Sequence, residues 1–206
     1  MKDIGLMHYS SGLEVWQRDG EIFLNQGKYI VEILKRFRMM DCKSMTTLMN
    51  SNLKLLCVDT SEPLDPTMYI QVIRLLMYLV NSIPNICFAV NALSQYLVEL
   101  RRVHWIEAKH ILRYLKGTIG YGLRYVSDEK LELHGYTDFE WARSAVDRKI
   151  TSRCCFNLGS GMISWYGRKQ TSVALTTSEA KYIAACGVSK EAVWLRRCLQ
   201  DYLISM

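Results

Sequence analysis

The spacing of apolar residues changes from a helical to a strand-like period near Gly117. Before that point, apolar residues recur every three or four positions in several segments, as on one face of a helix. These segments begin near Tyr29, after Pro66, after Pro84 and at His104. They predict an N-terminal domain, residues 1–117, that is mostly helical.

A hairpin is predicted before these helices. Two apolar runs within residues 13–24 flank Asp19-Gly20, a dipeptide that tolerates the positive φ angles of a tight turn. Residues 41–62 show no regular pattern and are the expected linker.

Beyond Gly117, apolar and polar residues alternate in short segments, which predicts strands. The segments are 122–126, 131–138, 151–158, 162–167 and a short one at 173–175. Residues 159–161 (Gly-Ser-Gly) predict a hairpin turn, and a long helix is predicted over residues 179–202 with Ser178 as its N-cap. The expected fold is α+β, with a second domain over residues 118–206 in which one helix covers a sheet.

The composition indicates a globular, intracellular protein. Half of the 206 residues are hydrophobic, enough to bury a core. The first residues lack the apolar run of a signal peptide, and no stretch of eighteen apolar residues predicts a membrane span. We therefore expect no membrane partner and a location in the cytoplasm or nucleus.

Basic residues gather in two stretches with aromatic residues among them, and the net charge is +6. This arrangement suits phosphate backbones and base faces. An ordinary solvated helix face is the alternative, and composition alone favours it. The candidate nucleic-acid-binding residues are Arg101, Arg102, Lys109, Arg113, Lys116, Arg148, Lys149, Arg168 and Lys169.

The seven cysteines form no C-x-x-C pair, and the four histidines have no metal-ligand spacing. Neither a disulfide framework nor a zinc site is expected. We expect mostly buried, reduced thiols.

Six segments stand out in order along the chain. They are MKDIG with SGLEV, YIQVIRLLMYLVNSIPNICFAVNALSQYL, HWIEAKHILRYLKGT, GYTDFEWA, DRKITSRCCFNLGSGMISW and LTTSEAKYIAA. Together they resemble the C-terminal part of the copia-type retrotransposon Pol polyprotein, nearly end to end. The resemblance implies a thumb- or connection-like reverse-transcriptase tail, then a truncated RNase H-like mixed sheet with one long helix.

The resemblance also implies a metal site. RNase H-type hydrolysis needs several carboxylates that converge on two divalent metals, and oxygen ligands suit magnesium. Asp138 matches the first metal ligand and Glu179 the second, so both are candidate catalytic and Mg²⁺-binding residues. Taken alone, Asp138 also reads as a turn former and Glu179 as a residue favoured by the helix dipole.

Departures from the family pattern predict a vestigial site. The third and fourth carboxylates of the family would lie beyond Met206, which leaves magnesium binding weak or absent. Arg143 and Arg153 stand where glycine is usual, and Lys181 stands where glutamate is usual. A missing strand would also expose the edge of the first strand to self-association.

These observations favour a catalytically inactive remnant of a reverse transcriptase/RNase H that keeps weak affinity for RNA–DNA hybrids or other nucleic acids. Polymerisation by this chain is excluded because it contains no Asp-Asp pair. The alternatives are an active RNase H completed by another chain, and a non-enzymatic basic module that binds nucleic acid.

Overall fold

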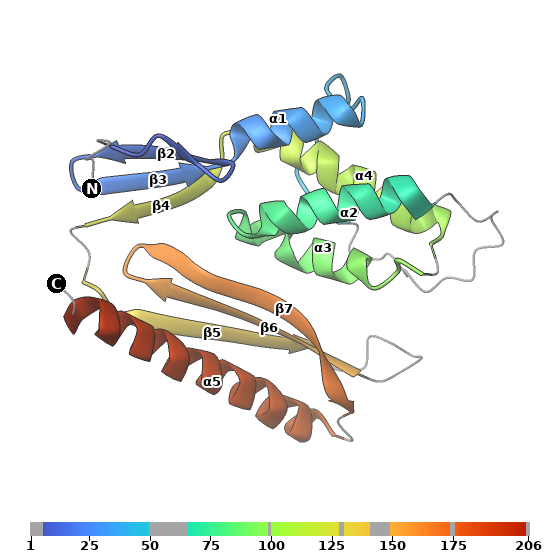
Figure 1. Ribbon diagram of the computed structural model, residues 1–206. Coiled ribbons are helices and arrows are strands. Elements are labelled where there is room, and N and C mark those ends of the chain that lie inside the picture. Colours follow the sequence, from blue (N-terminus) through green and yellow to red (C-terminus); the bar gives the residue numbers. More distant parts are fainter. Residues whose placement is uncertain are drawn as a thin grey trace. The chain divides into compact units, whose positions relative to one another are not determined.

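The computed structural model describes residues 6–49, 66–98, 100–127, 130–140, 149–173 and 176–204 (Figure 1). The chain divides into two compact units, Met1–Ser127 and Asp128–Met206. An antiparallel sheet is combined with several helices in the first unit and with one long helix in the second, which confirms the predicted α+β class.

The N-terminal unit contains a four-stranded antiparallel sheet. Its strands, in spatial order, are β1 (Tyr9–Ser10), β2 (Leu13–Arg18), β3 (Glu21–Asn25) and β4 (Gly122–Val126). The predicted hairpin is confirmed, and Gly20 in its turn has a φ of 71°. Ser11 and Gly12, between β1 and β2, also have positive φ angles.

Helices form the rest of this unit. They are α1 (Gly27–Arg36), α2 (Pro66–Val80), the 3-10 turn η1 (Pro84–Ile86), α3 (Cys87–Ser94) and α4 (Arg102–Gly117). Their apolar faces form one core, in which Leu34, Leu76 and Ile111 are fully buried. The Tyr69 hydroxyl reaches across this core and donates a hydrogen bond to the Leu93 carbonyl (2.8 Å).

The boundary between the units follows Ser127 rather than Gly117. After α4 the chain returns to the first sheet, where β4 pairs with β3 from Glu21↔Val126 to Asn25↔Gly122. The segment predicted to open the second domain is therefore the last strand of the first unit. Of the expected linker, residues 41–49 have no regular secondary structure, and the remainder lies outside the described residues.

The C-terminal unit consists of a three-stranded sheet and one long helix. Its elements are β5 (Leu133–Glu140), β6 (Lys149–Leu158), β7 (Gly161–Val173) and α5 (Thr177–Ile204). The described strands are antiparallel in the order β5-β6-β7, rather than mixed. The predicted turn at 159–161 joins β6 to β7, and Gly159 has a φ of 55°.

Helix α5 covers one face of this sheet (Figure 1). Cys154 and Phe156 of β6 are buried there with Leu195 of α5. The Ser164 hydroxyl of β7 also donates a hydrogen bond to the Glu191 carboxylate on the helix (3.0 Å). Small buried residues, Ala180 and Ala184, bring the first turns of α5 close to the strands.

Candidate functional site

Asp138, the candidate metal ligand on β5, lies directly opposite Arg153 on β6. A guanidinium nitrogen of Arg153 (Nη1) lies 3.3 Å from Asp138 Oδ2. The Asp138 side chain is 69% exposed and that of Arg153 30%. The carboxylate therefore already has a cation beside it.

The alternation of side chains along β6 places this pair on the face away from α5. Cys154 and Phe156 point toward the helix. Successive side chains of a strand point to opposite faces, and directly paired residues share a face. Arg153, and with it Asp138, therefore lies on the face that α5 does not cover.

Glu179, the second candidate, lies in the first turn of α5. Its backbone N–H donates to Thr176 Oγ1 (3.1 Å), and the Ala180 N–H donates to the Thr176 carbonyl (3.1 Å). Thr176 is therefore the N-cap, and the prediction of Ser178 was wrong because the helix begins at Thr177. Thr176 and Glu179 have the spacing of a capping box, so the replacement of the usual glutamate by Lys181 leaves that spacing intact.

The two candidate carboxylates do not fit a shared magnesium site. Figure 1 shows α5 beginning at the end of the unit where β5 ends, so both lie at the same end. However, Asp138 points away from the helix that carries Glu179, and Arg153 occupies one of its oxygens. Among the described residues, no group of three or more His, Cys, Asp or Glu side chains is placed to hold a metal ion.

The basic residues of α4 divide into two sets. Arg113 Nε donates to the Lys43 carbonyl (2.7 Å), and Lys116 Nζ donates to the Cys42 carbonyl. The Met45 N–H in turn donates to the Arg113 carbonyl (3.2 Å). These contacts hold the segment after α1 against α4, so Arg113 and Lys116 have a structural role.

Arg102 and Lys109 form the exposed set on α4. Lys109 Nζ lies 5.1 Å from the centre of the Trp105 ring, a cation–π contact. Arg101, which precedes the helix, is half-buried and donates its backbone N–H to His104 Nδ1 (3.1 Å). Their spacing places Arg102 and Lys109 on the same side of α4 as Trp105, so two exposed cations share this surface with an aromatic ring.

The remaining candidates belong to the C-terminal unit. The Arg168 guanidinium lies 4.9 Å from the centre of the Tyr166 ring. Arg148 lies outside the described residues, as do the side chains of Lys149 and Lys169.

The cysteines differ in exposure more than expected. Of the six that the structure describes, only Cys87 and Cys154 are buried, and Cys186 is exposed. All six are free thiols. Burial raises the pKa of the Cys154 thiol to about 11, which disfavours its reactive thiolate.

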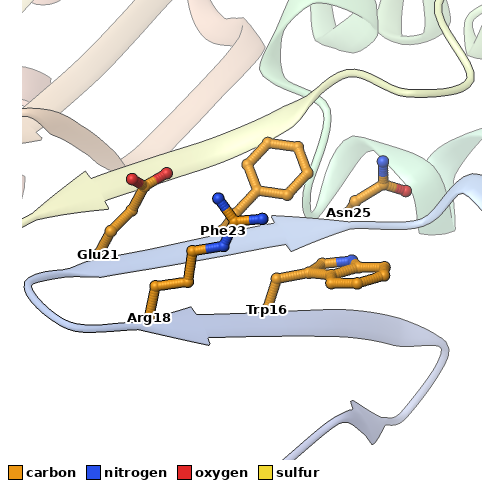
Figure 2. A pocket seen from close by; sticks show the side chains of 5 residues that line it. All are labelled: Trp16, Arg18, Glu21, Phe23 and Asn25. Atoms are coloured by element: carbon orange, nitrogen blue, oxygen red, sulfur yellow. The ribbon is translucent and has the colours of Figure 1, made fainter.

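Sequence reasoning missed a pocket on the N-terminal sheet. It has a volume of about 320 Å³ and is lined by Trp16, Arg18, Glu21, Phe23 and Asn25. Figure 2 shows these side chains projecting from β2 and β3 over one side of the sheet. The predicted hairpin could have indicated this surface, because strand pairing across Asp19-Gly20 puts these alternate residues on one face of the sheet.

The fold thus defines a two-unit α+β protein. The chain is 36% identical over 210 residues to the retrovirus-related Pol polyprotein from transposon TNT 1-94 of Nicotiana tabacum, across 98% of its own length and 16% of that relative. It is 34% identical over 201 residues to the retrovirus-related Pol polyprotein from transposon RE1 of Arabidopsis thaliana, across 98% of its length and 14% of the relative. An uncharacterized mitochondrial protein of Arabidopsis thaliana is 34% identical over 194 residues, 94% of this chain and 80% of the relative.

The chain belongs to the retrovirus-related Pol polyproteins of copia-type transposons. It spans less than a fifth of the two transposon polyproteins. No protein-family model matches it, and no solved structure is significantly similar to it. None of its described helices combines the length and apolar character that crossing a membrane requires.

Proposed function

We propose that this chain is the part of a copia-type Pol polyprotein in which the end of the reverse transcriptase meets the start of RNase H. In this proposal the chain binds nucleic acid without cleaving it. The order of the six family-like segments supports the assignment, as does the division into a helical and a strand-rich unit.

The pairing of Asp138 with Arg153 is the observation that carries the proposed inactivity. Two-metal hydrolysis needs carboxylates that converge on the ions and remain available to them. A guanidinium stays charged at any ordinary pH, so Arg153 competes with a divalent ion for the Asp138 oxygens. Asp138 also lies on the sheet face that α5 does not cover, whereas Glu179 is on α5. This difference in orientation works against convergence of the two carboxylates on one ion.

A cleavage assay tests this part of the proposal. The full chain would be incubated with a labelled RNA–DNA hybrid in Mg²⁺ and in Mn²⁺, with an active RNase H as positive control. We expect no cleavage by the wild type or by Asp138→Asn. Mg²⁺-dependent cleavage that Asp138→Asn abolishes would overturn the proposal in favour of an active nuclease.

Binding is proposed to involve the exposed cations of α4. Arg102 and Lys109 beside Trp105 present charge and an aromatic surface together. Contacts to phosphates release counterions, so affinity falls with salt. The measurement is the fluorescence anisotropy of a labelled hybrid at several salt concentrations.

Each cation that contacts a phosphate contributes about 0.9 to the slope of log affinity against log salt on a duplex. We expect the double variant Arg102→Gln/Lys109→Gln to bind more weakly and to show a flatter slope. Lys130→Gln is the control, because Lys130 is also an exposed cation (86%) but belongs to the other unit. Absence of binding by the wild type at low salt would overturn the binding proposal.

A further inference from the structure

One face of the N-terminal sheet carries aromatic and arginine side chains in register. Trp16 on β2 lies opposite Phe23 on β3, which lies opposite Arg124 on β4. In the adjacent row, Arg18 lies opposite Glu21. Directly paired residues of antiparallel strands share a face. The opposite face carries Val15, which is buried.

The aromatic face is open. Trp16 is 60% exposed, unusual for a large aromatic residue in the middle of a strand. Figure 2 shows the Trp16 and Phe23 rings and the Arg18 guanidinium projecting from β2 and β3 on the same side of the sheet. These residues line the pocket of about 320 Å³, so they form a shaped surface.

The floor of this surface is held in place. Gly122 lies opposite Asn25, and a Cβ there would clash with the Leu24 carbonyl oxygen and lie 2.9 Å from Phe23 Cζ, so the backbone of β3 and the Phe23 ring both require glycine at this position. Asn25 is 8% exposed. Its side-chain oxygen accepts from the Gly27 N–H, and its nitrogen donates to the Ile119 carbonyl (3.3 Å). Asn25 therefore anchors the end of β3 to α1 and to the loop before β4.

The charge of the surface is positive. Arg124 makes two hydrogen bonds to Glu21, from Nε to Oε1 (2.7 Å) and from Nη2 to Oε2 (2.9 Å). This bidentate pair neutralises both groups. Arg18 carries the remaining charge at the edge of the aromatic row.

We infer that this face binds single-stranded nucleic acid, with a base stacked on Trp16 beside Phe23 and a phosphate on Arg18. Aromatic rings on a sheet suit unpaired bases, whose π faces are free, whereas bases inside a duplex remain stacked on one another. The surplus positive charge favours a phosphate over an acidic or purely apolar partner. The inference rests on the proposed function only in that the ligand is a nucleic acid.

The test measures the affinity of the full chain for fluorescein-labelled dT12 at several salt concentrations. Loss of a stacked base costs about tenfold in affinity, which we expect for Trp16→Ala with little change in the salt slope. Trp16→Phe should retain most of the affinity. Arg18→Gln should instead flatten the slope by about 0.7, the contribution of one phosphate contact on a single strand.

Trp194→Ala is the matched control, since Trp194 is similarly exposed (56%) but belongs to α5. Circular dichroism would confirm that each variant is folded.

If the wild type binds dT12 and Trp16→Ala binds it equally well, the inference is wrong while the proposed function stands. If the wild type binds no nucleic acid at low salt, both fail. Unchanged dT12 affinity with a lower sedimentation coefficient in Trp16→Ala would assign the face to a second copy of the chain.

Discussion

Glu21 shows how one residue can organise a surface. The hydrogen bonds from Arg124 are the main cause of a lowered Glu21 pKa, with further attraction from Arg124 and Arg18. Burial acts in the opposite direction and does not prevail. Since the folded pKa lies below the unfolded value, the pair stabilises the fold above the unfolded pKa and loses this effect as pH falls through the folded pKa.

Replacing Arg124 with glutamine should raise the pKa of Glu21 toward its ordinary value. The reason is that Arg124 supplies the hydrogen bonds that favour the ionised form. The measurement is an NMR titration of the Glu21 carboxyl carbon in wild type and Arg124→Gln. Lys28→Gln, which removes a different ion pair, with Glu14, serves as control. An unchanged Glu21 midpoint in Arg124→Gln would contradict the described contact.

The sequence predicts the position of Asp138 but not the residue that pairs with it. Its position at the end of a strand was predicted, and it lies on β5. Its pairing with Arg153 depends on the register of two strands, which no local pattern specifies. The sequence identified Arg153 as a substitution for glycine, but only the fold shows that this arginine lies beside the carboxylate.

At the scale of elements, local patterns predicted most helices and strands. The hairpin turns at Gly20 and Gly159 were correct because positive φ angles have a clear residue preference. Two errors had different causes. Strand β4 was assigned to the wrong unit because its pairing with β3 spans most of the N-terminal unit in sequence. The start of α5 was misplaced because Thr176, Thr177 and Ser178 are all plausible caps.

The α5 cap gives a direct test. Thr176→Ala removes the oxygen that accepts the Glu179 N–H and should lower the free energy of unfolding by about 1 kcal/mol. Ser178→Ala is the control: Ser178 lies inside the helix, so its loss should change stability much less. Urea denaturation followed by circular dichroism measures both. A larger effect of Ser178→Ala would restore the cap predicted from the sequence.

At the scale of the whole molecule, each unit has its own core. Leu76 is fully buried among the helices of the N-terminal unit. Phe156 is 2% exposed between β6 and α5 of the C-terminal unit. Among the described residues, the members of the first core all belong to Met1–Ser127, and those of the second core all belong to Asp128–Met206. Separate cores permit separate unfolding transitions, because cooperativity follows shared packing.

We therefore expect two transitions in differential scanning calorimetry of the full chain. Leu76→Ala should destabilise the N-terminal unit by about 2–5 kcal/mol and lower one transition, leaving the other in place. Phe156→Ala should do the reverse, at a cost of about 3–5 kcal/mol. Each substitution thus acts as the control for the other. If instead both variants shift one shared transition, the units unfold together and the expectation of two transitions is wrong.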